Sequence, residues 1–185
     1  MKPWSVDSEA ISRNRKLYWT WKTVALRKRC NHSYAHSEPG GGYKRSMVTA
    51  REYNDLRKGT WVGELRIEIT AVEPGRLVAE VQVRKELLSP NGFLHAASVV
   101  AFADSLCGSG TMENLPEKAS GYTTIELKAN LIGTVRDGHI ECEATLVHSG
   151  RSTQVWDAKV TAKETGRVIA LFRCTQLILY PQSAK

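Results

Sequence analysis

The sequence predicts an α+β domain in which an antiparallel sheet curls around one long central helix. Residues 96–111 form the one long apolar segment of helical length. Two strand-like segments precede it and four follow, and turn sequences separate the last four. Such short connections favour antiparallel pairing. A single sheet can bury an apolar helix of this kind only by wrapping around it.

One short helix and two strands are predicted before the long helix. Residues 49–52 match a capping box, which predicts a helix from there to about Lys58. Apolar and charged residues alternate over 65–69, as in a half-buried strand. Residues 73–76 form a turn that leads into a second strand over 77–83.

Four strands are predicted after the long helix. They cover residues 123–131, 140–146, 156–162 and 168–179. The turn sequences between them are Asp137-Gly138, 149–152 and 164–167. We interpret each of these turns as a hairpin connection.

Charge divides the chain near residue 46. Residues 1–46 hold 10 of the 26 Lys and Arg residues but only 3 of the 19 Asp and Glu residues, whereas residues 47–185 are neutral overall. We interpret 47–185 as the folded domain and 1–46 as a basic, disordered extension or the product of a misassigned start before Met47. Two other interpretations of 1–46 stay open: an arm that contacts nucleic acid or membrane, and a short docking helix.

Cysteine spacing and hydropathy exclude several classes of protein. The four cysteines include no C-x-x-C pair, which argues against structural zinc and for a reducing compartment. No apolar run approaches the roughly 20 residues of a membrane span, and no signal-type core follows the first methionine. We therefore expect a cytoplasmic protein that needs no metal or redox cofactor and whose expected partners include neither membrane nor nucleic acid.

The start and middle of the long helix carry the candidate chemistry. A turn ending at Gly92 leads to His95 and then to small residues, which leave the first helical amides accessible. Asp104 is the single acid in an apolar stretch, where an unpaired carboxylate is costly to bury. His95 and Asp104 are nine residues apart, so about 13 Å separates them along the helix. Both can act on one carbonyl group only if the site combines two chains.

The strand order and these residues resemble the hotdog fold, and within it the PaaI-like acyl-CoA thioesterases. Their motif is N-x-x-G-x-x-H-G-G with an acid nine residues after the histidine, and Gly92, His95 and Asp104 match it. Ser89 replaces the usual Asn or Gln, and alanines replace the glycine pair. The resemblance extends over about residues 49–180, including a post-helix strand from Gly121 and a coenzyme A turn at 150–153.

The resemblance implies a homo-oligomer, a dimer or a dimer of dimers, that hydrolyses an acyl-CoA ester to a carboxylic acid and free coenzyme A. Asp104 is then the base or the nucleophile, the Ala96 N–H the oxyanion donor, and His95 a positioning residue. The residues expected to contact substrate are Ser89, Asn91, Gly92, Gly108, Thr123, Arg151, Ser152 and Thr153.

Two other functions stay open from the sequence. A hydratase or dehydratase of the same fold needs a different arrangement of histidine and acid, and no such pair stands out. A non-catalytic acyl-CoA sensor would bind the ester without hydrolysing it, and its basic N-terminal segment would contact nucleic acid with a steep salt dependence.

Overall fold

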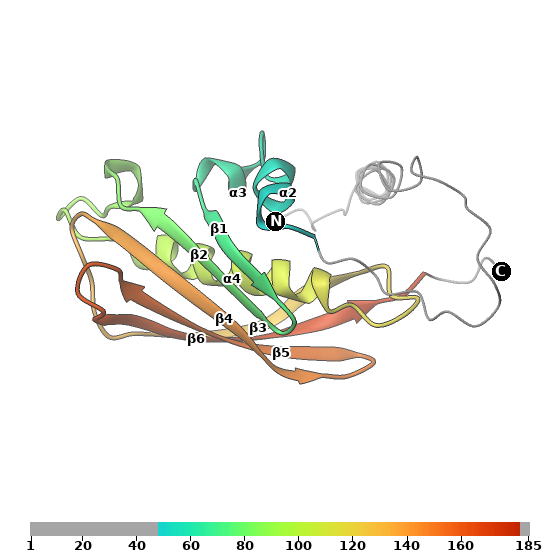
Figure 1. The fold of residues 1–185 in the computed structure, drawn as a ribbon. Coiled ribbons are helices and arrows are strands. Elements are labelled where there is room, and N and C mark those ends of the chain that lie inside the picture. Colours follow the sequence, from blue (N-terminus) through green and yellow to red (C-terminus); the bar gives the residue numbers. More distant parts are fainter. Residues whose placement is uncertain (1–47, 182–185) are drawn as a thin grey trace, which may run out of the picture. The chain divides into compact units, whose positions relative to one another are not determined.

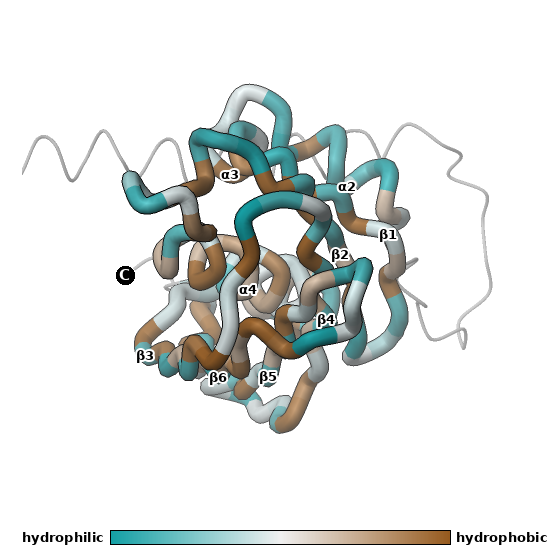
Figure 2. Tube along the Cα trace, turned by 90° about the vertical axis from the view of Figure 1, so that its left-hand side faces the viewer, coloured by the Kyte–Doolittle hydropathy of each residue, from teal (hydrophilic) through white to brown (hydrophobic). Residues whose placement is uncertain are grey.

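The computed structural model of the protein describes residues 48–181, so the predicted extension 1–46 lies outside the described part. A six-stranded sheet curls around one long helix, α4 (Ala96–Glu113), as the view along that helix shows (Figure 2). The predicted α+β architecture is therefore confirmed.

The sheet is antiparallel throughout, and its order differs from the order of the sequence (Figure 1). Its strands are β1 (Glu68–Glu73), β2 (Arg76–Gln82), β3 (Gly121–Leu131), β4 (His139–Ser149), β5 (Thr153–Ala162) and β6 (Val168–Leu179). They lie in the order β1-β2-β4-β5-β6-β3. The strand that follows α4 therefore forms an edge of the sheet.

The predicted hairpin at Asp137-Gly138 is wrong, whereas the β4–β5 and β5–β6 hairpins are confirmed. Strand β3 pairs with β6, and β4 pairs with β2 and β5, so the 137–138 turn joins strands that are not neighbours. Gly138 has the expected left-handed φ of 78°, and its carbonyl accepts from the Val83 N–H. The local turn was correctly predicted, but strand pairing depends on distant residues.

The segment before the sheet contains two short helices and a single turn of 3-10 helix, η1 (Lys85–Leu87). Helix α2 (Ala50–Leu56) begins with the predicted capping box at Thr49. Helix α3 (Trp61–Glu64) was not predicted, and it delays the first strand from residue 65 to Glu68. Helix α2 packs on α4, where the Tyr53 hydroxyl donates to the Glu113 carboxylate at 2.8 Å.

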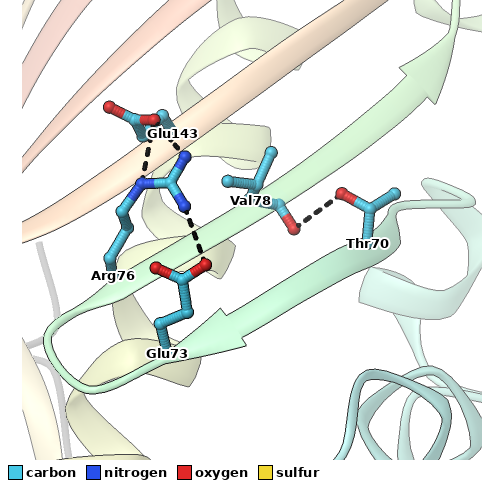
Figure 3. Close-up of polar contacts among 5 residues, drawn as sticks. All are labelled: Thr70, Glu73, Arg76, Val78 and Glu143. Atoms are coloured by element: carbon cyan, nitrogen blue, oxygen red, sulfur yellow. Dashed lines mark hydrogen bonds and ion pairs between the residues drawn. The ribbon is translucent and has the colours of Figure 1, made fainter.

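Ion pairs and hydrogen bonds tie neighbouring strands together on the face of the sheet away from α4. Arg76 of β2 contacts Glu73 of β1 at 3.2 Å and Glu143 of β4 at 2.6 Å (Figure 3). The Thr70 hydroxyl donates to the Val78 carbonyl in the same region at 3.3 Å. These side chains are partly exposed, so each ion pair contributes little to stability.

Close packing between α4 and the sheet depends on glycine at position 110. A Cβ added there would lie 2.5 Å from the ring of Trp156, which is fully buried. We predict that Gly110→Ala lowers the free energy of unfolding by about 1–3 kcal/mol because of this overpacking, even though alanine favours helix. Chemical denaturation measures the change. Gly121→Ala, where the added carbon meets open space, is the control, and an equal loss in both variants would contradict the prediction.

Candidate active site

The N-terminus of α4 presents an accessible backbone amide. His95 is the N-cap residue, and its Nδ1 accepts from the Ala97 N–H at 2.9 Å. Because Nδ1 is the acceptor, the neutral ring carries its proton on Nε2, where it can donate outward. The Ala96 N–H has no hydrogen-bond partner among residues 48–181, and His95, Ala96 and Ala97 are exposed. The first free amide of the helix is thus open to a ligand.

A tight loop positions the residues that precede the helix. The Ser89 N–H donates to the Phe93 carbonyl at 2.7 Å, and the Asn91 side chain accepts from the Phe93 N–H at 3.2 Å. Gly92 has a φ of 80°, which suits glycine. The Arg136 guanidinium lies 3.9 Å from the centre of the Phe93 ring. Three predicted substrate-contacting residues, Ser89, Asn91 and Gly92, therefore lie beside the helix start.

Asp104 lies two turns farther along α4 and is half-buried. Its Oδ1 accepts from the Thr124 hydroxyl of β3 at 3.2 Å, and it forms no ion pair with any residue from 48 to 181. Burial raises the pKa of Asp104, and the hydrogen bond from Thr124 partly opposes that rise. The carboxylate is therefore a stronger base than an exposed aspartate.

Thr124 links Asp104 to a buried amide. Its hydroxyl also lies 3.0 Å from Oε1 of Gln176, which is fully buried in β6. A hydroxyl has one proton, so Asp104 and Gln176 compete for it. The ionised carboxylate is the stronger acceptor, and Thr124 therefore stabilises the charged form of Asp104.

A second side chain of β3 lies on the same side as Thr124. The Tyr122 hydroxyl contacts α4 where Gly108 lacks a side chain: a Cβ there would be 2.2 Å from it. Burial, followed by the nearby charge of Asp104, raises the pKa of Tyr122 to about 12. The tyrosine thus remains a neutral phenol. It also fills the space beside Gly108, where the sequence had suggested a substrate contact.

Apart from Gly108 and Thr123, the predicted site residues fall into three groups in one chain. Residues 89–96 lie at the start of α4, and Asp104 lies at its middle. Arg151 and Ser152 lie in the β4–β5 turn and Thr153 begins β5, near the opposite end of α4. There the side-chain amide of Gln154 donates to the carbonyl of the α4 C-cap, Asn114, at 2.6 Å. Since α4 has 18 residues, about 27 Å separates its two ends. One chain therefore does not bring the three groups together.

The structure adds Thr124 and Gln176 to the site, which sequence reasoning missed. Thr123 had been predicted instead of Thr124, and the structure leaves Thr123 exposed. Alternate residues of a strand point to opposite faces, so a shift of one position exchanges the two threonines. Thr124 and Gln176 are register partners on neighbouring strands. Their contact can therefore be inferred only after β3 and β6 are known to pair.

Neither a metal-binding cluster nor an exposed thiol occurs among the described residues. Within 48–181, no group of three or more His, Cys, Asp or Glu side chains is placed to hold a metal ion. Cys107, Cys142 and Cys174 are buried free thiols, and burial raises the pKa of Cys142.

None of the helices in the described part of the chain has both the length and the hydropathy of a membrane span.

Comparison with known proteins identifies the family. The sequence model of the thioesterase superfamily matches residues 91–169. A 1,4-dihydroxy-2-naphthoyl-CoA hydrolase from Listeria monocytogenes is 32% identical over 109 residues, which cover 59% of this chain and 87% of that protein. The chain belongs to the thioesterase superfamily.

Other relatives of this thioesterase agree with that assignment. A proofreading thioesterase from Klebsiella pneumoniae is 32% identical over 125 residues, covering 68% of this chain and 89% of the other. The crystal structure of a thioesterase from Haemophilus influenzae superposes with a TM-score of 0.69 at 26% identity, covering 73% and 93% of the two chains. The resemblance to PaaI-like hotdog thioesterases is confirmed, and the protein is a thioester hydrolase.

Proposed function

We propose that this thioesterase hydrolyses an acyl-CoA ester to a carboxylic acid and free coenzyme A, with Asp104 as the catalytic carboxylate. The observation that carries the proposal is the state of Asp104, which is half-buried, has a raised pKa and forms no ion pair with the described residues. A structural aspartate on an apolar helix would need a cation or several donors to offset its desolvation. The relative from Listeria monocytogenes, named as a CoA hydrolase, supports coenzyme A as the thiol.

Asp104 and the helix N-terminus at Ala96 have different roles in the proposed reaction. Asp104 either takes a proton from the attacking water or attacks the thioester carbonyl itself to form an anhydride that water then opens. In both routes the carbonyl oxygen becomes negative, and the Ala96 N–H donates to it at the positive end of the helix dipole. His95, through Nε2–H, holds the carbonyl in position. The coenzyme A thiolate leaves and takes up a proton.

The site needs a second copy of the chain. Ala96 and Asp104 are eight residues apart on one straight helix, about 12 Å along its axis, which is too far for both to contact one carbonyl group. Strand β3, which carries Thr124, is an edge strand with exposed apolar side chains, Ile125 and Leu127 among them. Exposed edges of this kind pair with other chains. We place the dimer contact along β3, beside Asp104, with a tetramer formed from two such dimers.

Hydrolysis of a panel of acyl-CoA esters tests the proposal. Short aliphatic, medium-chain and aryl esters are each mixed with the protein, and free thiol is measured as it forms. We expect turnover of at least one class by the wild-type protein and near-complete loss in Asp104→Asn purified in parallel, which controls for contaminating hydrolases. Tight binding of the esters without thiol release would contradict the proposal and favour a non-catalytic sensor.

The hydrogen bond from Thr124 predicts a shift in the pH dependence. Because that bond lowers the pKa of Asp104, Thr124→Val should raise it further. The base form of Asp104 is lost as pH falls through its pKa, so the acid limb of the kcat profile should move to higher pH in the variant. Thr123→Val, on the exposed side of the same strand, is the matched control. Identical profiles for Thr124→Val and the wild type would rule out the coupling.

A further inference from the structure

Arg57, just after α2, is a buried cation whose hydrogen bonds are incomplete. Its side chain is 8% exposed, and Nη2 donates to the Ser109 hydroxyl of α4 at 2.7 Å. The other terminal nitrogen, Nη1, is fully buried and has no hydrogen-bond partner. No carboxylate among residues 48–181 forms an ion pair with Arg57. Burying a charge in this way is costly unless a ligand completes its contacts.

The position of Arg57 connects it to the proposed active site. Its partner Ser109 follows Gly108, where the Tyr122 hydroxyl contacts α4. The charge of Arg57 acts on the Tyr122 phenol, and so does the charge of Asp104. Asp104 and Gly108 are four residues apart, so they share one face of α4 at a spacing of about 6 Å. Tyr122 therefore contacts α4 one turn beyond Asp104, and Arg57 contacts it one residue farther on, at Ser109.

The guanidinium of Arg57 is suited to binding oxygen acceptors. Arginine remains charged when buried, and its planar array of donors fits a carboxylate with two parallel hydrogen bonds. A water molecule satisfies one donor but neutralises no charge. Tyr122 lies on the edge strand and fills the space beside Gly108, so an acyl group that passes along α4 to Arg57 must displace its ring.

We propose that Arg57 binds the far end of the acyl group, and that the enzyme prefers acyl-CoA esters whose acyl group carries a carboxylate about 6 Å or more beyond the thioester carbonyl. The preference rests on the proposed function, because it assumes that the carbonyl carbon lies at Asp104. The acyl group then extends along α4 past Tyr122, and its carboxylate takes the Nη1 donor and neutralises the buried charge.

Matched esters and variants test this preference. The esters are hexanoyl-CoA against adipoyl-CoA, and benzoyl-CoA against 4-carboxybenzoyl-CoA, so each pair differs by a terminal carboxylate. We expect the wild-type kcat/KM to favour the carboxylated member by roughly 10- to 100-fold, as for a charge-assisted hydrogen bond. Arg57→Met, of similar length, should abolish that preference while retaining hydrolysis of the plain esters. Lys58→Met removes an adjacent exposed cation and should leave the preference intact.

Binding and stability separate this inference from the proposed function. Hydrolysis-resistant thioether analogues of the four esters report affinity without chemistry. If the analogues show the preference and Arg57→Met loses it, the inference holds even where the esters are not hydrolysed, and the proposed function alone fails. Equal affinities within each pair for the wild type, or equal losses in Arg57→Met and Lys58→Met, would overturn the inference.

The folding of the variant is a further readout. Since methionine replaces a cation with an unmet hydrogen bond, Arg57→Met should melt at the same temperature as the wild type or higher. A lower melting temperature would assign Arg57 a structural role and contradict the inference. Arg57→Lys keeps the charge but not the planar donor pair, and it should retain the fold with a reduced preference.

Discussion

Replacing Asp104 with asparagine is expected to lower kcat by about 10²- to 10⁴-fold, the range that general acid–base catalysis supplies. Asparagine is nearly the same size, and its carbonyl oxygen can still accept from the Thr124 hydroxyl, but it cannot take a proton from water or form an anhydride. Steady-state hydrolysis of the best acyl-CoA ester, followed by thiol release, measures the loss. Turnover within a few-fold of the wild type would remove Asp104 from the mechanism.

The same variant should remain folded, which separates catalysis from stability. The raised pKa of Asp104 means that the folded state favours the protonated form. Above the folded-state pKa, ionised Asp104 therefore lowers the free energy of unfolding. This loss of stability disappears as pH falls below the unfolded-state pKa. Asparagine carries no charge, so Asp104→Asn should melt at the same temperature or higher at neutral pH, with the gain absent in acid. Thermal melts at two pH values check this sign.

Replacing Ala96 with proline is expected to lower kcat by about 10²- to 10³-fold, because it deletes the proposed oxyanion donor. Ala96 is the first residue of α4, a position where proline is well tolerated, and His95 already has the extended backbone that a following proline requires (φ −71°, ψ 137°). The variant thus removes one N–H group without breaking the helix. Ala96→Ser keeps the N–H and should retain most of the activity, and an equal loss in both would contradict the assignment.

Mixing the two inactive variants tests whether the site is shared. In a dimer of Asp104→Asn with Ala96→Pro, one of the two sites combines an intact Ala96 N–H with an intact Asp104. Random exchange of subunits makes about half the dimers mixed, so activity should recover to about a quarter of the wild-type value. Co-refolding the variants in equal amounts measures it. If mass spectrometry demonstrates mixed dimers and hydrolytic activity still does not recover, each site belongs to one chain.

Local features of the sequence predicted most of the individual elements. The capping box at Thr49, the start of the long helix at Ala96 and the last strand over Val168–Leu179 all appear as expected. Each depends on hydrogen bonds and periodicity within a few residues, so the information lies in the segment itself. The delay of β1 to Glu68 is the exception, because α3 and its Thr60 cap occupy the preceding residues.

The same local patterns do not predict contacts between distant segments. The sequence placed a carboxylate on α4 and a histidine at its start, but not Thr124 beside the carboxylate, since a strand's face is set by its pairing register. No sequence pattern distinguishes Arg57 from other cations at the end of a short helix, because its burial results from packing against Ser109 of α4.

By itself, the sequence determined where most of the helices and strands form and which helix carries the candidate catalytic acid, because these features follow from short-range periodicity, capping and turn residues. Only the tertiary structure decided that β3 forms the edge beside Asp104, which threonine contacts that acid and which arginine is buried with an unmet hydrogen bond. These outcomes depend on pairing and packing between residues far apart in the chain, and no local pattern encodes the partner.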